Sequence, residues 1–227
     1  MLSPVSLEDA RRVLADDLLG PDEVAAAFGG AQPPAPPIPF ARDELTAARA
    51  RGEMLVLRLA QVGDGQPLTL MHMLRHAPDA FDQKLLRQVG YQLKDEWGIE
   101  LEPLAQTDTC TAGWALAAKA VLPETCNRAY DEQEPLLRRY AEVAGPFLAS
   151  WRRRTAVEAV YDTLLYFTTR RVRLLEKTWD WTASRTLDGG YLHVGGFGPG
   201  GMQILAFSRA IRHGALGLCP TRQETMG

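Results

Sequence analysis

The side chains best suited to binding chemistry lie near the C-terminal end of the sequence. Tyr191, His193, Gln203 and Phe207 occur in two short alternating runs, and the segment 208–214, Ser-Arg-Ala-Ile-Arg-His-Gly, follows them. Planar amphipathic side chains of this kind provide contact area and hydrogen bonds at low entropic cost. The pattern predicts a binding face. The residues alone leave an alternative open, in which Tyr191 and Phe207 cover a second layer of core.

Catalytic motifs are scarce by comparison. The sequence contains no Gly-x-Ser-x-Gly elbow, no glycine-rich phosphate loop ahead of a helix and no His-Glu-x-x-His motif. The glycine-rich run 195–201 includes Pro199 and lies between two expected strands, so it predicts a turn. His72 and His76 are four residues apart, but no third ligand follows at metal-binding spacing. We therefore expect a binding protein rather than an enzyme, without metal or cofactor.

The cysteines also give no indication of a metal site or of catalytic chemistry. Cys110, Cys126 and Cys219 are odd in number, widely spaced and outside any Cys-x-x-Cys pattern. This usage favours reduced, buried thiols over a disulfide framework or a structural zinc. A nucleophilic pair of Cys219 with His213 is disfavoured, because strand alternation puts Cys219 on the face opposite Leu216 and Leu218, at the surface or against a neighbouring layer.

Length and composition indicate a globular protein. The chain has 227 residues, of which 46% are hydrophobic and 23% charged, with a formal net charge of -3. These values exclude a disordered or fibrous chain. No window approaches the roughly 18 apolar residues of a membrane helix, and no secretion signal is visible, so a cytoplasmic protein without a membrane span is expected. Nucleic acid is not an expected partner, and the clusters 152–154 and 170–173 are expected to form a solvated helix rim.

Helical and extended segments set the expected domain plan. Helices are predicted after Ser6 and over 21–28, forming a helical N-terminal element over 1–30. The Pro-rich segment 31–39 is predicted to be an extended linker, followed by one domain over 40–227. Within that domain the patterns predict helices over 43–51, 67–75, 81–97, 130–143 and 155–168, the last one amphipathic, and strands over 54–59 and 113–119.

The segment after Trp179 changes character. Short alternating runs separated by glycine turns predict a compact antiparallel unit, with strands over 179–182, 191–197, 202–207 and 215–219. Since successive strand side chains point to opposite faces, the runs predict an apolar buried set. That set is Leu192, Val194, Met202, Ile204, Leu216 and Leu218.

Several motifs together carry a resemblance to a known family. They are the stretch 155–162, Trp181-Thr182, Asp188-Gly189-Gly190, Val194-Gly195, Phe197-Gly198 and Leu216-Gly217-Leu218 with Arg222. In these motifs the chain resembles the C-type lectin-like variable proteins that are diversified by retroelements. The similarity covers roughly residues 40 to 222 and is strongest after 155.

The resemblance implies an α+β protein with a C-type lectin-like fold, a short twisted antiparallel sheet with flanking helices. It further implies that the segment of about 179–222 displays a diversifiable surface for a protein or other macromolecular ligand, in an oligomeric state that the sequence does not indicate. The scaffold residues implied are Trp181, Gly189, Val194, Gly195, Phe197, Leu216, Gly217 and Arg222. The variable, ligand-facing positions implied are Ser184, Arg185, Tyr191, His193, Gln203, Leu205, Phe207, Arg209, Arg212 and His213.

Departures from related patterns leave two alternatives. The Glu-Pro-Asn and Trp-Asn-Asp groups of calcium-dependent sugar-binding lectins are missing from the sequence, so a calcium-dependent sugar site is not expected. The same fold resembles formylglycine-generating oxidases, for which Cys219 would have to pair with Cys110 or Cys126. A phage tail-tip adhesion component is the other alternative, and it shares the binding chemistry.

Overall fold

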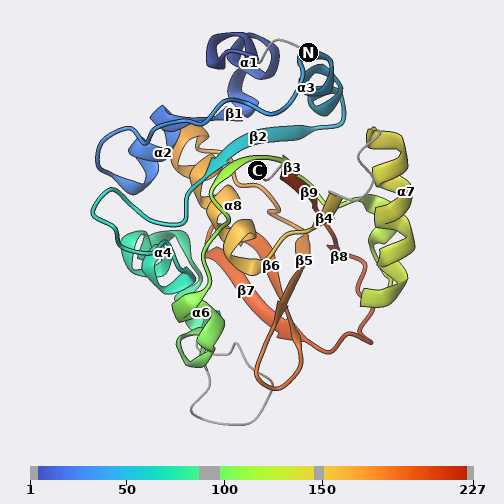
Figure 1. The fold of residues 1–227 in the computed structure, drawn as a ribbon. Helices are drawn as coiled ribbons and strands as arrows, with labels where there is room; N and C mark the ends of the chain where they lie inside the picture. Colours follow the sequence, from blue (N-terminus) through green and yellow to red (C-terminus); the bar gives the residue numbers. More distant parts are fainter. Residues whose placement is uncertain (1–4, 87–97, 146–150, 224–227) are drawn as a thin grey trace.

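The computed structural model describes residues 5–86, 98–145 and 151–223, and its architecture is α+β (Figure 1). Two small sheets lie on either side of helix α8 (Ala156–Arg170), which contacts β2 of one sheet and both β5 and β6 of the other. The mixed fold class expected from the sequence is therefore confirmed at this level.

The first sheet has the strand order β1-β2-β3-β9-β4. Its strands are β1 (Leu18–Leu19), β2 (Glu53–Arg58), β3 (Gly113–Ala118), β9 (Pro220–Gln223) and β4 (Trp151–Arg153). The pair β1 and β2 is parallel, and the remaining pairs are antiparallel. Every residue of β2 is buried, which explains its nearly continuous apolar run.

The second sheet has the order β7-β6-β5-β8. It comprises β5 (Trp179–Arg185), β6 (Tyr191–Gly198), β7 (Gly201–Phe207) and β8 (Leu216–Gly217). The β5, β6 and β7 strands form the expected antiparallel hairpins, but β8 pairs with β5 in parallel. The expectation of a purely antiparallel unit is wrong at this edge. A parallel neighbour requires a crossover, and the loop after β7 supplies it.

The remaining helices surround these layers. They are α1 (Leu7–Leu14), α2 (Pro21–Phe28), α3 (Arg42–Ala50), α4 (Leu70–His76), α5 (Gln83–Leu86), α6 (Pro103–Thr107) and α7 (Glu134–Ala144). The helix predicted over 81–97 is seen only as α5, and residues 87–97 lie outside the described part. The helix predicted over 130–143 starts with a 3-10 turn, Tyr130–Gln133, before α7.

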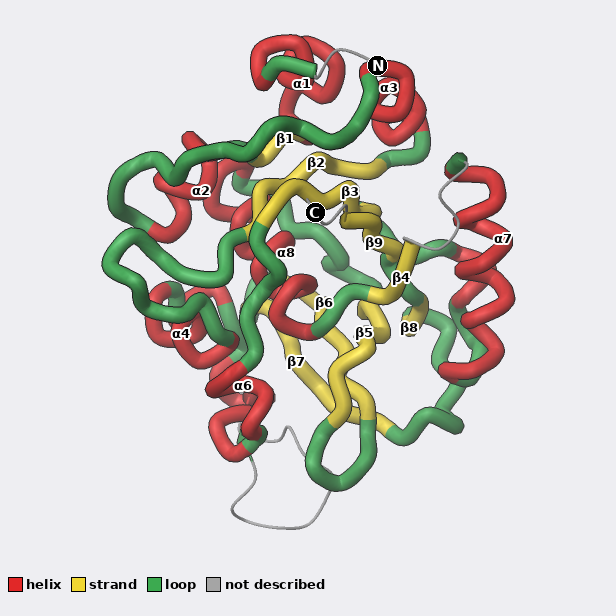
Figure 2. Tube along the Cα trace, viewed as in Figure 1, coloured by secondary structure: helices red, strands yellow, loops and turns green. Residues whose placement is uncertain are grey.

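Residues of the N-terminal element and of the later chain share one core. Strand β1 joins the first sheet through β2, and Leu14, Leu18 and Phe28 belong to the same hydrophobic cluster as the residues of α8. The Pro-rich segment runs without helix along this core, and Trp114 Nε1 donates a hydrogen bond of 2.8 Å to the Pro36 carbonyl (Figure 2). The segment 31–39 is therefore held at Pro36 and at the buried Ile38, while most of its other residues are exposed.

Helix α8 is buried on all sides. Thr155 caps its N-terminus through a reciprocal capping box with Glu158, as the sequence signature favours. The predicted helix is confirmed, but all residues from Ala156 to Tyr166 are buried, so the expectation that it is amphipathic is wrong over this stretch. The reason is that both sheets cover it, whereas helical periodicity reports only the most apolar side.

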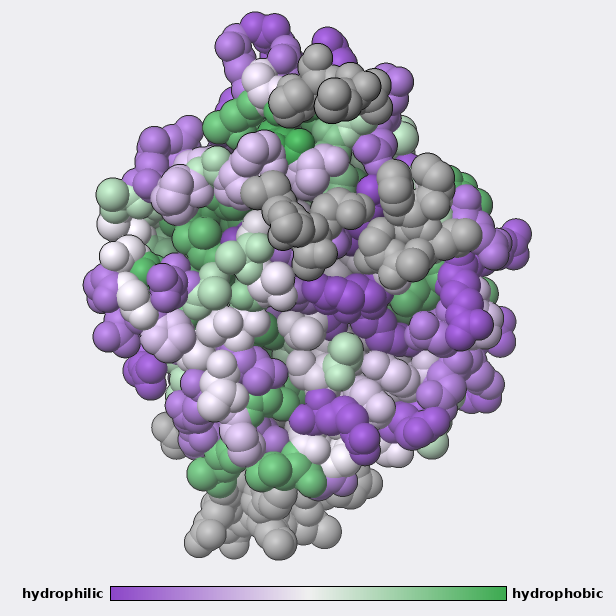
Figure 3. Space-filling view, in the orientation of Figure 1, coloured by the Kyte–Doolittle hydropathy of each residue, from purple (hydrophilic) through white to green (hydrophobic). Residues whose placement is uncertain are grey.

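The molecular surface mixes polar and apolar residues. On the face seen in Figure 3, hydrophilic residues cover most of the α7 side, and hydrophobic residues appear in small separate patches. Among the described residues, none of the helices combines the length and apolar character that crossing a membrane would require.

Candidate ligand-binding site

The register of the second sheet places most of the predicted ligand-facing residues on one face. Trp181 pairs with His193, and His193 pairs with Leu205. A second row runs across Arg185, Tyr191 and Phe207. Residues directly opposite one another in paired strands project to the same side, so both rows share a face, which we call the outer face.

The opposite face of the sheet forms core. Leu192, Val194, Met202 and Ile204 are all fully buried. Leu216 is 2% exposed and Leu218 is fully buried. The predicted apolar set is therefore confirmed as buried, but Leu216 is in register with Trp179, so it lies on the outer face and not with the inner-face core.

A second layer covers one end of the outer face. Trp181 lies on this face yet is fully buried, because the ring of Tyr130 packs edge-on against it at 5.3 Å. Tyr130 also stacks on Tyr191 at 4.1 Å, with Arg153 held over the Tyr130 ring at 4.0 Å. Arg153 donates hydrogen bonds to the carbonyls of Tyr130 and Trp181. Tyr191 and Phe207, the two residues of the alternative with a second core layer, are both half-buried, and each stacks on another ring, Tyr191 on Tyr130 and Phe207 on His193.

A small apolar pocket of about 200 Å³ opens next to this layer. Its lining is Trp179, His193, Leu205, Phe207, His213 and Leu216. Phe207 stacks on His193 with ring centroids 4.7 Å apart, and His213 meets Trp179 edge-on at 6.0 Å. Four predicted ligand-facing residues, on two strands and the following loop, therefore meet in one cavity.

His193 is the exception to the predicted exposure. Its side chain is only 2% exposed, so the expectation that it stands on an open surface is wrong. The stacked Phe207 ring and the pocket walls exclude water from it. Burial lowers the pKa of His193 to about 4, so the imidazole is neutral at neutral pH. Its Nδ1 has no hydrogen-bond partner of good geometry among the described residues.

We expect this buried imidazole to make folding stability depend on pH. The unfolded chain takes up the proton near pH 6.5, whereas the folded state resists it until about pH 4. Below the unfolded pKa the unfolded state binds more protons, so stability falls as the pH drops through this window. The wild type should lose up to about 3 kcal/mol more than His193→Phe between pH 7 and pH 4. Urea denaturation at several pH values measures this difference, and parallel curves for the two proteins would contradict it.

Charged residues form the rim of the site. Arg185 lies over the Tyr191 ring at 5.4 Å. Arg209 pairs with Asp131, and Arg212 pairs with Glu132, so the loop after β7 is tied to the 3-10 turn before α7. Both ion pairs are solvent-exposed and contribute little stability. These guanidinium groups are therefore available to exchange partners.

Gln203 and Ser184 differ in what surrounds them. Gln203 is half-buried and lies in register with Gly195 on the outer face. Ser184 is 9% exposed, and its Oγ accepts a 2.9 Å hydrogen bond from the backbone N–H of Ala156. The expectation that Ser184 faces a ligand is wrong, because its hydroxyl satisfies the first turn of α8 instead.

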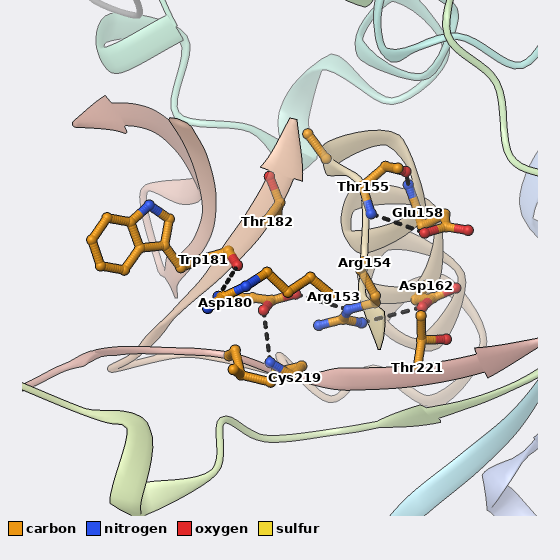
Figure 4. Close-up of polar contacts among 12 residues, drawn as sticks. Arg153, Arg154, Thr155, Glu158, Asp162, Asp180, Trp181, Thr182, Cys219 and Thr221 are labelled. Atoms are coloured by element: carbon orange, nitrogen blue, oxygen red, sulfur yellow. Dashed lines mark hydrogen bonds and ion pairs between the residues drawn. The ribbon is translucent and has the colours of Figure 1, made fainter. Parts of the chain in front are cut away.

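A buried ion network holds the scaffold behind this face (Figure 4). It consists of Arg58, Arg154, Glu158, Asp162 and Asp180, each at most 2% exposed. Arg154 donates to Asp180 at 2.8 Å and to Asp162 at 3.1 Å, and Arg58 bonds both Asp162 and Glu158. Asp180 also accepts the backbone N–H of Cys219 at 2.7 Å. The network thereby joins β2, α8, β5 and the segment before β9.

This network corrects the interpretation of one basic cluster, 152–154, whereas residues 171–173 of the other cluster are exposed at the end of α8, as expected. Arg153 and Arg154 lie on or beside strand β4 and are 5% and 1% exposed, so they do not form a solvated helix rim. Burial opposes ionisation of Glu158, but the charges of Arg58 and Arg152 outweigh it and lower its pKa to about 2. Each carboxylate of the network is thus engaged with a cation, which suits a structural role better than proton transfer.

The cysteines are unpaired and mostly inaccessible. Cys110 and Cys219 are buried and Cys126 is half-buried, with no disulfide among them. Burial raises the pKa of both buried thiols well above the usual range, which disfavours the reactive thiolate. The prediction of reduced, buried thiols is confirmed for Cys110 and Cys219.

Sequence reasoning missed two residues of the site. Trp179 was expected only as a strand residue, although its alternation with Trp181 signals that both lie on one strand face. Tyr130 carries no local signal, because it reaches the outer face from a distant part of the chain. In the described ranges no group of three or more His, Cys, Asp or Glu side chains is placed to hold a metal ion.

Comparison of the chain with protein-family models, with curated proteins and with solved structures finds no match.

Proposed function

We propose that this chain is a ligand-binding protein with a C-type lectin-like fold, and that the outer face of β5, β6 and β7 with the 208–214 loop forms its recognition surface. The observation that carries the proposal is the aromatic pocket beside β5, one wall of which, His213, belongs to the loop that bears the exposed Arg209 and Arg212. Interfaces that bind protein partners use such buried aromatic and Arg anchors, surrounded by a polar rim.

The two faces of the second sheet differ in their contribution to stability, and this difference supports a diversifiable surface. The inner face is held by the hydrophobic core and by the ion network, so strand register does not depend on the residues of the outer rim. Arg185, Arg209, Arg212 and His213 are exposed, and Gln203 and Leu205 are half-buried. Substitution at these positions leaves the core contacts in place, as mutagenesis by a retroelement would require.

The oxidase alternative has less support. It requires a cysteine pair that reaches a substrate, whereas Cys110 and Cys219 are buried with pKa values raised by desolvation. A phage tail-tip component remains a variant of the same proposal, because it would use the same surface.

A pair of libraries tests the recognition surface. The first library randomises Gln203, Leu205, Arg209, Arg212 and His213 in the full chain displayed on yeast. The control library randomises four exposed positions on one side of α3: Asp43, Thr46, Ala47 and Ala50. Both are sorted for folded clones and then for binding to a panel of purified proteins.

We expect both libraries to fold, and only the first to yield binders that compete with one another. The reason is that the outer face offers a pocket and a polar rim, whereas the α3 positions lie on the solvent-exposed side of a helix. Binders from both libraries at equal frequency, or a first library that is mostly unfolded, would refute the proposal. Independently, the adjacent DNA should encode a reverse transcriptase and a near-copy of the 3′ coding segment that differs at adenines.

A further inference from the structure

We propose that the pocket on the outer face is an anchor site for one tyrosine-like side chain of a protein partner, a planar aromatic ring with a hydroxyl tip. The inference rests on the proposed function and specifies the chemistry of the ligand. Size is the first argument. The cavity measures about 200 Å³, below the roughly 300–1,000 Å³ of pockets for drug-sized ligands, which suits a single side chain.

The walls favour an aromatic ring over an aliphatic group. The stacked pair His193 and Phe207 offers one planar surface, and the edge-on pair Trp179 and His213 offers another. Aromatic rings gain from offset-stacked and edge-to-face contacts beyond the area they bury. Leu205 and Leu216 complete the lining with aliphatic contacts.

The polar atoms of the pocket favour a hydroxyl on that ring. Nδ1 of His213 accepts the backbone N–H of Ala215 at 3.2 Å, which leaves Nε2 as the donor of that ring. His193 is buried in the same lining, and its Nδ1 has no hydrogen bond of good geometry beyond a weak interaction with the backbone of Tyr191. A hydroxyl both donates and accepts, so it can pair with either imidazole, whereas a purely apolar ring leaves His193 unsatisfied.

The surroundings favour a protein partner over a free small molecule. Tyr191 is the cross-strand neighbour of the lining residue Phe207, and the exposed Arg209 and Arg212 lie on the same loop as the lining residue His213. A central aromatic anchor within a polar, Arg-rich rim is the arrangement of a protein-protein hot spot.

Fragment binding to the full chain tests the anchor. NMR titration compares p-cresol, which mimics the tyrosine side chain, with toluene, which lacks the hydroxyl. We expect p-cresol to bind roughly two- to tenfold more tightly than toluene, the ratio that one hydrogen bond supplies. His193→Phe should reduce this ratio to near one while toluene affinity is retained.

A variant that fills the pocket provides a second test that does not depend on the folding of His193→Phe. Leu205→Trp should weaken both fragments at least about tenfold by occupying the cavity. Leu187→Trp, at a position that is 67% exposed, is the matched control and should leave both affinities unchanged. Equal affinity of the two fragments for the wild type, or p-cresol binding that survives Leu205→Trp, overturns the anchor proposal.

The two proposals fail separately. If the display library yields binders but p-cresol does not bind, the anchor is wrong and the recognition surface stands. If p-cresol binds as expected and the library yields no binders, the pocket accepts an aromatic group and the recognition function is wrong.

Discussion

Replacing Arg154 with methionine should lower the stability of this protein by about 3 to 5 kcal/mol, because it leaves the buried Asp180 without its ion-pair partner and Asp162 with Arg58 alone. Arg154 is 1% exposed and bonds both Asp162 and Asp180, which are fully buried. For a chain of this length the loss corresponds to a decrease in Tm of about 10 °C. Thermal unfolding followed by circular dichroism measures it.

Arg209→Met is the matched control for that experiment. It removes the same type of cation from an ion pair with Asp131, but the two side chains of this pair are 60% and 62% exposed. Solvent screens such pairs, so the Tm should stay at the wild-type value. If the two variants had the same Tm, the network would not be what joins α8 to β5 and to the segment before β9.

Leu192→Ala and Ile204→Ala should each lower the free energy of unfolding by about 2 to 5 kcal/mol. Both side chains are fully buried on the inner face of the second sheet, and their truncation leaves a cavity that the neighbouring strands cannot fill. Gln203→Ala on the outer face and Arg212→Ala on the 208–214 loop should change the free energy of unfolding by no more than about 0.5 kcal/mol. Urea denaturation of the four variants gives the comparison.

The result would separate scaffold from recognition within single strands. Ile204 is the immediate neighbour of Gln203 on β7, so the two variants differ in sheet face and little else. Equal losses at both positions would mean that the outer face is also structural, and the recognition surface would have to lie elsewhere. His193 now belongs with the core set in this comparison, since only 2% of it is exposed.

The sequence by itself determined the local elements and the two faces of the second sheet. Alternation of apolar and polar residues identified Leu192, Val194 and Ile204 as core, because the two-residue period of a strand is a local property. The helical periodicity of the stretch 155–168 located α8 for the same reason, since it involves only residues three and four apart.

Only the tertiary structure decided which of these residues water can reach. Tyr130, which is distant in sequence, covers Trp181, and His213 of the 208–214 loop lines the same pocket as His193. No local sequence pattern predicts these contacts. Arg153 and Arg154 look like a surface cluster in sequence, yet their partners lie on β5, on α8 and in the turn before α7. Burial and charge pairing depend on contacts between distant segments, whereas periodicity reports only the direction in which a side chain leaves its own backbone.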